Sequence, residues 1–340
     1  MKIMIVTDAW KPQVKGVVTT LGKIGEGLSN IGHEVRFVTP LDFRSVACPT
    51  YPEIRLSLFA STGIRKTIEE FAPDAIHIAT EGPLGIAARR YCLAHRLAFT
   101  TAFHTRFAEY VHARFRIPVN FTYHWLRRFH APSRAVMVPT PAVCRELESR
   151  HFNNIVLWTR GVDTETFYPV ERNKLGNERP IFLYVGRVAV EKNIEAFLDL
   201  DLPGPKWVVG EGPSRTKLER KYPDVSFEGI KTPRELARYY SAADVCVFPS
   251  LTDTFGLVML EALACGTPVA AFPVHGPIDV IGDGGAGALD KDLRAACLKA
   301  LDIDRGHARA YAERFSWHES IRQFESYLTP AGTALAGLAA

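Results

Sequence analysis

Short apolar segments alternate with segments of helical length along the whole chain, and this alternation restricts the possible folds more than any other feature. In the first half we predict strands over residues 2–7, 35–39, 75–78, 99–103, 136–139 and 155–157. In the second half we predict strands over residues 181–185, 207–209, 225–227, 245–248 and 269–272. Strands that alternate with helices form parallel sheets with helices on both faces. The sequence therefore predicts two α/β domains, each with a doubly wound parallel sheet.

A segment rich in charged and turn-forming residues, PVERNKLGNERP at 169–180, separates the two series of strands. We therefore place the domain boundary near Val170. Ligands of doubly wound folds bind beyond the carboxyl ends of the strands. We expect the side chains that carry chemistry to follow strand ends, in a cleft between two facing domains.

Composition excludes several other classes of protein. Hydrophobic residues make up 47% and charged residues 23% of the chain, which is typical of a globular protein. The six cysteines form no CxxC pair, which argues against a disulfide framework or a zinc site and indicates a reducing compartment. The N-terminal MKIMIVTD lacks the apolar core of a signal peptide, and no run reaches about 18 apolar residues. We expect a cytoplasmic protein without a membrane-spanning helix.

Glu261 lies within an apolar stretch of the segment PSLTDTFGLVMLEALACGTP at 249–268. The segment predicts a helix over 255–265 that is buried on every side. We expect its N-cap among Thr252, Asp253 and Thr254 and its stop at Gly266. Because burial of an unpaired carboxylate costs several kcal/mol, Glu261 needs a partner. The partner is either a structural salt bridge or a ligand that presents hydroxyl groups.

Asp253 precedes Glu261 by eight positions, which is about 12 Å along a helix axis. The free amides of a helix N-terminus lie between these carboxylates and favour anions. Asp253, the helix amides and Glu261 would therefore bind a hydroxyl, an anion and a hydroxyl in that order. A sugar joined through a diphosphate to ribose presents its groups in the same order.

Two cations follow the strand predicted at 181–185, in the segment GRVAVEKN at 186–193. Arg187 and Lys192 on a strand-to-helix turn can clamp phosphate oxygens, and Arg can bind two of them at once. The alternative is that both side chains are simply solvated. Their position at a strand end favours the clamp.

Other strand-end residues carry weaker signals. Gly16 opens a helix after the first strand, and Gly210 belongs to a GxG that resembles half of a dinucleotide loop. His104 ends the strand at 99–103, where it has either a functional role in the cleft or a structural one. Three Asp-x-Asp pairs, at 199/201, 290/292 and 302/304, lie away from strand ends and are expected to be solvated. With two cations for a diphosphate, the site requires no metal ion.

The four motifs GRVAVEKN, DTFGLVMLE, RGVDTETFYP and FSWHESIRQFESYL together resemble glycosyltransferase family 4, whose members are retaining enzymes. The resemblance covers residues 1–330 and implies the GT-B fold, in which two Rossmann-like domains face a central cleft. It implies an acceptor-binding domain at 1–169 and a nucleotide-sugar-binding domain at 170–310. A helix at 311–330 would return to the first domain and leave a tail at 331–340. No cofactor is implied, because the nucleotide sugar is a substrate.

The resemblance also implies roles for individual residues. Arg187 and Lys192 would hold the donor diphosphate, Asp253 the hydroxyls of the transferred sugar, and His104 would lie near the reacting sugar. Further donor contacts are implied for Gly16, Gly210, Ile230, Thr254, Phe255, Gly256, Leu257 and Glu261, the last with the ribose. Two residues depart from the family pattern. Asp253 stands where Glu is usual, which changes the sugar that fits, and Lys15 precedes Gly16 where Gly or Asn is usual.

Residues 87–134 form a basic and aromatic window, with nine Arg, one acidic residue and ten aromatic residues for a net charge of +8. We predict that this window associates with an anionic membrane surface, because Arg attracts lipid headgroups and aromatic rings settle at the interface. The alternative is that many of the rings form the core of the first domain. The residues expected at the acceptor or membrane surface are Arg106, Arg114, Arg116, Trp125, Arg127 and Arg128.

TDTFG followed by PVHGPIDVIG is similar to the lipid glycosyltransferase branch of the family. We therefore expect transfer of a hexose or uronic acid from a UDP-sugar to a membrane lipid such as diacylglycerol, at the inner face of the membrane. The alternatives are a GDP-mannose-dependent mannosyltransferase and a nucleotide-sugar 2-epimerase. A nucleic-acid-binding module is disfavoured, because the rest of the chain is acidic.

Overall fold

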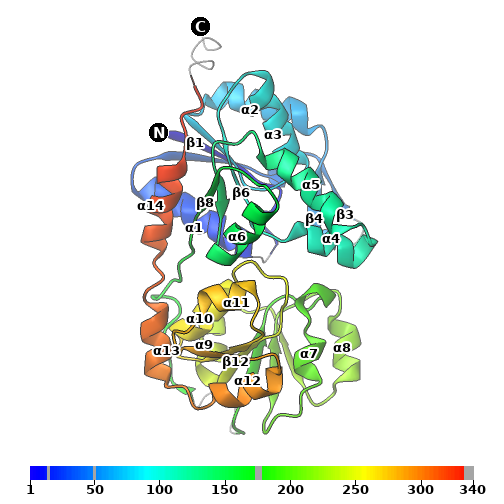
Figure 1. The fold of residues 1–340 in the computed structure, drawn as a ribbon, viewed down its shortest axis with the longest axis vertical. Helices are drawn as coiled ribbons and strands as arrows, with labels where there is room; N and C mark the ends of the chain where they lie inside the picture. The colour runs from blue at the N-terminus through cyan, green and yellow to red at the C-terminus, as the bar shows by residue number, and fades with distance from the viewer. Residues whose placement is uncertain (14–15, 49–50, 173–177, 333–340) are drawn as a thin grey trace. The chain divides into compact units, whose positions relative to one another are not determined.

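A computed structural model describes residues 1–13, 16–48, 51–172 and 178–332, except for the side chains of residues 51–54 and 113–114. The chain forms two compact units (Figure 1). Unit 1 contains Met1–Thr159 and the residues from His318 onward, and unit 2 contains Arg160–Trp317. Both units are α/β, which confirms the predicted fold class.

The sheet of unit 1 contains six parallel strands in the order β2-β1-β5-β6-β7-β8. The strands are β1 (Lys2–Val6), β2 (Glu34–Val38), β5 (Ala75–Ile78), β6 (Thr100–Ala102), β7 (Val136–Val138) and β8 (Ile155–Leu157). All six were predicted from their apolar segments. Alternate residues of β1 enter different cores: Ile3 packs in one cluster and Met4 in another. The sheet is therefore buried on both faces, as a doubly wound fold requires.

Helices cover the sheet of unit 1 on both faces (Figure 1). They are α1 (Gly16–Asn30), α2 (Ala60–Phe71), α3 (Pro83–Ala94), α4 (Phe107–Phe115), α5 (Val119–His130), α6 (Pro141–Ser149) and the short η1 (Pro40–Asp42). The buried carboxylate of Asp8 follows β1 and accepts hydrogen bonds from the amides of Leu84 and Gly85 in the first turn of α3. These hydrogen bonds fix the start of α3 at the carboxyl end of β1.

The sheet of unit 2 also contains six parallel strands, in the order β11-β10-β9-β12-β13-β14. They are β9 (Phe182–Val185), β10 (Lys206–Val209), β11 (Ser226–Gly229), β12 (Val245–Phe248), β13 (Val269–Ala271) and β14 (Gly287–Leu289). The helices are η3 (Val190–Lys192), α7 (Glu195–Leu198), α8 (Arg215–Lys221), α9 (Pro233–Ala242), α10 (Leu257–Ala264), α11 (His275–Val280), α12 (Leu293–Ala300) and α13 (Arg305–Ala312).

Three strands were not expected from the sequence. β3 (Ser45–Cys48) and β4 (Tyr51–Ser57) form an antiparallel hairpin in the connection between β2 and α2. Polar and charged residues interrupt the apolar pattern of this hairpin, which lies outside the parallel sheet. β14 is three residues long and begins with Gly287, so its local pattern is weak, and its pairing with β13 defines it.

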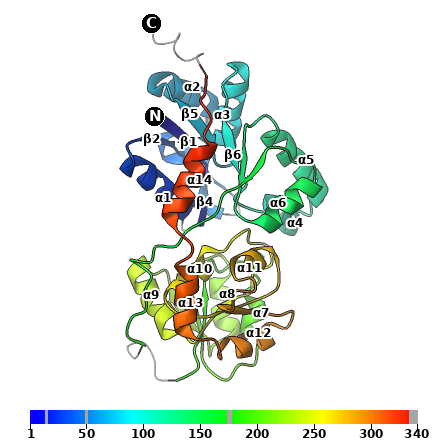
Figure 2. The ribbon, with the colours of Figure 1, turned by 60° about the vertical axis from the view of Figure 1, so that its left-hand side comes forward.

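The last helix, α14 (Trp317–Tyr327), packs on unit 1 alongside α1 (Figure 2). The indole Nε1 of Trp158 donates to the carbonyl oxygen of Ser320 over 3.1 Å, and Phe324 is fully buried in a core of unit 1. Gly27 permits the close approach, because a Cβ atom there would overlap Ile321. The predicted return of the C-terminal helix to the first domain is confirmed.

The division between the units falls between Thr159 and Arg160, earlier than the predicted position near Val170. Val162 and Phe167 pack in the core of unit 2, and Arg309 of α13 donates to the carbonyl oxygen of Phe167 over 2.8 Å. The second unit extends to Trp317 rather than to residue 310. Residues 173–177 of the expected linker and 333–340 of the expected tail lie outside the described residues.

Candidate active site

The carboxyl ends of two neighbouring strands of unit 2, β9 and β12, lead into the segments at 186–193 and 249–256. Three side-chain contacts join these segments. Asn193 Nδ2 donates to the carbonyl oxygen of Pro249 over 3.0 Å, and Thr252 Oγ1 donates to that of Glu191 over 3.2 Å. Lys192 forms an ion pair with Asp253. The structure therefore brings together the two motifs that the sequence singled out.

The predicted cations of this site face carboxylates. The side chains of Lys192 and Asp253 are 21% and 18% exposed, and the Arg187 guanidinium lies 3.8 Å from Oε1 of Glu191. The second oxygen of Asp253, Oδ2, is buried and accepts no hydrogen bond from any described residue. A buried carboxylate oxygen without a donor is costly, so Asp253 is suited to bind a hydroxyl group.

The helix that carries Glu261, α10, begins later than predicted. Its N-cap is Gly256, with φ +88° and no side-chain cap, so the predicted cap among Thr252, Asp253 and Thr254 is wrong. A Cβ atom at Gly256 would lie 2.8 Å from Cε of Met259 and 2.9 Å from Cζ of Phe248. The glycine therefore permits a tight turn that leaves the first amides of the helix unbonded by a cap. Gly266 ends the helix with φ +74°, as predicted.

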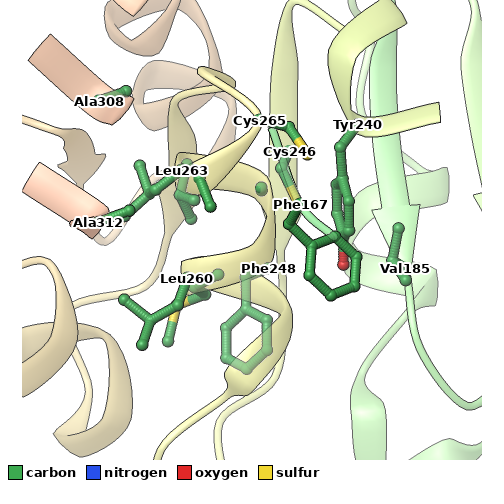
Figure 3. Packing of buried hydrophobic residues seen from close by; sticks show 14 of the residues in the cluster. Phe167, Val185, Tyr240, Cys246, Phe248, Leu260, Leu263, Cys265, Ala308 and Ala312 are labelled. Carbon is green, nitrogen blue, oxygen red and sulfur yellow. The ribbon is translucent and has the colours of Figure 1, made fainter. Parts of the chain in front are cut away.

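Most of α10 is buried in the main core of unit 2. Leu260 and Leu263 pack there with Phe248 and with Ala308 and Ala312 of α13 (Figure 3). The expectation that the helix is buried on every side is wrong, however. Leu257, Val258 and Glu261 lie along one side of the helix and remain partly exposed. A ligand can therefore reach that side.

Glu261 has a protein partner that the sequence did not reveal. The hydroxyl of Tyr240, a buried residue of α9, donates to Oε2 of Glu261 over 3.0 Å. Tyr240 lies in the same core as Phe167 and Val185 (Figure 3). Among the described residues Glu261 forms no ion pair with Arg or Lys, which removes the salt-bridge alternative. Burial raises the pKa of Glu261 to about 7.

The predicted glycine loop packs against the backbone of the segment at 186–193, which carries Arg187 and Lys192. Gly210 has φ +141°, and a Cβ atom there would overlap the carbonyl oxygen of Gly186. The amide of Val188 donates to the carbonyl oxygen of Glu211 over 2.9 Å. Gly210 is therefore explained by the close approach of two backbones that positions Arg187. Ile230, directly after β11, is 59% exposed.

The two site residues predicted in the first half lie in unit 1, near the carboxyl edge of its sheet. His104 follows β6, and its ring meets that of Trp158 edge to face with centroids 5.6 Å apart. Gly16 is exposed and is the first residue of α1. Lys15, which departs from the family pattern, lies outside the described residues.

The basic and aromatic window divides into core and surface. The aromatic residues of this window that are buried are Tyr91, Phe99, Phe103, Tyr123 and Phe129. Those exposed by 37% or more are Phe107, Phe115, Phe121 and Trp125, all on α4 or α5. Arg116 and Arg128 are exposed and Arg127 is partly exposed. The side chain of Arg114 lies outside the described residues.

Arg106 does not lie on the surface as expected. Its guanidinium lies 2.7 Å from Glu146 and 3.3 Å from Glu109, and its side chain is only 13% exposed. These carboxylates neutralise the charge of Arg106, so this residue joins α4 to α6 rather than presenting a cation to an anionic surface.

Two of the Asp-x-Asp pairs have structural explanations. Asp292 caps α12 by accepting from the amide of Arg294, and Asp304 caps α13 by accepting from that of His307. Within the described residues, no three His, Cys, Asp or Glu side chains are grouped so that they could hold a metal ion. In the same part of the chain, no helix combines the length and the apolar character that crossing a membrane requires.

Comparison with known proteins identifies the class. Residues 14–166 match Glycosyltransferase Family 4, and residues 179–302 match Glycosyl transferases group 1. The structure of sucrose-phosphate synthase from Thermosynechococcus elongatus superposes with a TM-score of 0.79 at 22% identity, covering 96% of this chain and 97% of that one. Two doubly wound parallel sheets with this likeness define the GT-B fold, and the two family matches identify a glycosyltransferase.

Relatives in sequence point to the same class. Alpha-monoglucosyldiacylglycerol synthase of Streptococcus pneumoniae is 30% identical, over 88% of this chain and 78% of that protein. GDP-mannose-dependent alpha-mannosyltransferase of Corynebacterium glutamicum is 28% identical, over 90% and 82% of the two chains. The chain belongs to glycosyltransferase family 4 and is an enzyme.

Proposed function

We propose that the enzyme transfers a hexose or uronic acid from a UDP-sugar to a hydroxyl group of a membrane lipid such as diacylglycerol, with retention at the anomeric carbon. The observation that carries the proposal is the cluster at the ends of β9 and β12, where Lys192 meets Asp253 beside Arg187 and the start of α10. This cluster offers cations and amides to a diphosphate and a carboxylate to a sugar.

The diphosphate, the sugar and the ribose of the donor would each lie against different residues of this cluster. The diphosphate would lie against Lys192, Arg187 and the amides of Phe255 to Leu257. Asp253 Oδ2, which no described residue hydrogen-bonds, would accept a hydroxyl of the sugar. The partly exposed Glu261 would accept the ribose hydroxyls, with Tyr240 holding its other oxygen.

The reaction breaks the bond between the anomeric carbon and the diphosphate oxygen and forms a bond from the acceptor oxygen on the same face. The acceptor proton passes to the departing phosphate oxygen. Negative charge grows on the diphosphate, so Lys192 and Arg187 stabilise the transition state more than the bound donor. The two cations balance this negative charge without a metal ion.

Two observations support a lipid acceptor at a membrane surface. The relative from Streptococcus pneumoniae is named alpha-monoglucosyldiacylglycerol synthase, and that name specifies a diacylglycerol lipid. In unit 1, the apolar rings of Phe115 and Phe121 are 59% and 70% exposed, near the exposed cations Arg116 and Arg128 in the sequence. Exposed rings and cations on neighbouring helices suit an anionic interface, which would place the enzyme on the cytoplasmic face of the membrane.

A second candidate is a GDP-mannose-dependent mannosyltransferase. The relative from Corynebacterium glutamicum carries that name at comparable identity. In this alternative the same cluster holds the diphosphate, and only the base and the sugar differ.

A transfer assay tests both candidates. UDP- and GDP-linked hexoses and uronic acids are each incubated with the enzyme and a membrane lipid extract, and products are identified by mass spectrometry. We expect nucleotide release and a glycolipid with one donor of the UDP series. A mannolipid formed only from GDP-mannose would replace the first candidate with the second. Conversion of a donor without any acceptor would instead indicate an epimerase and overturn both.

A further inference from the structure

The surface of unit 1 has a hollow of about 210 Å³ that the proposed reaction does not use. It is lined by Asn120, Tyr123, His124, Arg127 and Arg150. Four of these residues lie on α5, and Arg150 follows the last residue of α6. None of the lining side chains is a carboxylate, and two are guanidinium groups. The volume is several times the share of about 30 Å³ that a water molecule takes in the liquid, so a tetrahedral oxyanion can enter.

The guanidinium group of Arg150 is held in a fixed orientation. Its central carbon lies 3.9 Å from the centroid of the Tyr123 ring, and Nη1 lies 3.4 Å from Oδ1 of Asn120. The hydroxyl of Tyr123 donates to Glu109 over 2.9 Å, which fixes the ring. The Nε atom of Arg150 is buried and donates to no described residue. Its Nη groups have only long contacts of 3.4 Å with described residues, Asn120 and Glu146, and can donate to an anion that enters the hollow.

The charge of Arg150 is only partly balanced by the protein. Its nearest carboxylate is Glu146, at 3.4 Å, and this carboxylate already binds Arg106 at 2.7 Å. Arg127, which also lines the hollow, lies 3.4 Å from Nδ1 of His124 and pairs with no described carboxylate. The hollow therefore has a net positive charge.

An exposed apolar face lies next to the hollow on α5. Asn120, His124 and Arg127 are spaced along one side of the helix. Phe121 and Trp125, each one position further on, are 70% and 37% exposed on the adjacent side. A ligand that fits both faces has an anionic group joined to an apolar group.

We propose that this hollow binds one phosphate group, and that the apolar face beside it selects the phosphate of an anionic phospholipid headgroup over free phosphate. The assignment of the phosphate to a lipid headgroup rests on the membrane association of the proposed function. The presence of a phosphate site in the hollow does not depend on it. A bound headgroup would hold α5 at the lipid surface independently of the donor site.

The test uses the full chain, with inorganic phosphate as one probe and vesicles of phosphatidylcholine with or without phosphatidylglycerol as the other. The variant Asn120→Asp places a carboxylate beside Arg150 without removing any packing. We expect it to bind phosphate roughly tenfold more weakly in a calorimetric titration at constant ionic strength. Arg150→Lys keeps the charge but loses the planar fork, and should weaken binding in the same direction. Arg65→Gln, an exposed cation on α2, is the control that should match the wild type.

The outcomes separate the alternatives. Loss of both phosphate and phosphatidylglycerol-vesicle binding in Asn120→Asp supports the headgroup, whereas loss of phosphate binding alone supports free phosphate and excludes the lipid source. Equal phosphate affinity in the wild type and both hollow variants, with unchanged circular dichroism, overturns the site. A wild type that binds phosphate here but transfers no sugar leaves this inference intact and contradicts the proposed function.

Discussion

The carboxylate of Glu261 accepts a hydrogen bond from Tyr240, and the residue is partly buried on α10. Burial raises the pKa of its carboxyl group to about 7, so the folded state retains a proton that the unfolded chain releases at lower pH. This contribution to stability is greatest below the unfolded pKa and is lost as the pH rises through about 7. Glutamine keeps the shape and the neutral state of the protonated side chain at every pH.

We therefore expect Glu261→Gln to be more stable than the wild type above about pH 7, by about 1–2 kcal/mol, and to show a smaller difference at acidic pH. Urea unfolding at two pH values, one on each side of about 7, measures the difference. The same variant should bind the donor more weakly, because an amide replaces the carboxylate that accepts the ribose hydroxyls. A stability difference that does not change with pH would contradict the assigned shift.

Lys192 is the cation whose removal should affect turnover most. Its ammonium group meets Asp253 at the ends of β9 and β12, where the diphosphate is proposed to leave. We expect Lys192→Ala to lower kcat by about 100- to 1,000-fold, which corresponds to roughly 3–4 kcal/mol of transition-state stabilisation. Steady-state transfer assays measure the loss. Lys217→Ala, an exposed lysine on α8, is the matched control, and equal activities in the two variants would refute the clamp.

At the scale of elements, the loop after β10 and the segment after β9 depend on each other through Gly210. Its φ of +141° and its contact with the backbone of Gly186 leave no room for a side chain. We expect Gly210→Ala to destabilise the protein by about 2–4 kcal/mol. Gly22 on α1 is exposed, and a Cβ atom there would meet nothing within 4 Å.

The matched variant Gly22→Ala should therefore stabilise the protein by about 0.5–1 kcal/mol, because alanine favours a helix. Urea unfolding midpoints compare the two variants with the wild type. We expect the two changes in the free energy of unfolding to have opposite signs, since the glycines differ in backbone conformation and in the space around them. Similar midpoints for both would mean that the segment after β9 can move to accept a side chain.

At the scale of the whole molecule, the net charge of +4 divides into a window of +8 at 87–134 and an acidic remainder. The exposed aromatic rings of this window lie on α4 and α5, so we place the proposed membrane surface on these two helices. Arg116 and Arg128 remain exposed.

Replacement of both Arg116 and Arg128 by Gln should reduce binding to anionic vesicles by roughly tenfold or more, at about 1 kcal/mol per cation near the surface. Vesicle co-sedimentation measures the bound fraction. A double variant of exposed cations elsewhere, Arg65→Gln with Lys217→Gln, carries the same net charge and should bind as the wild type does. Equal losses in both double variants would show that net charge alone governs binding.

The sequence by itself determined the strands of both parallel sheets except β14, and the segments that carry the candidate site, because strand formation and the residues at strand ends follow from local apolar patterns. It could not provide Tyr240 as the partner of Glu261, since the two residues lie on different helices and meet only through packing. It also placed Arg106 on the surface, although Glu146, forty residues further along, neutralises it. Only the tertiary structure decided these pairings and the hollow around Arg150. Burial and charge balance depend on which distant segments pack together, and a local pattern does not record that.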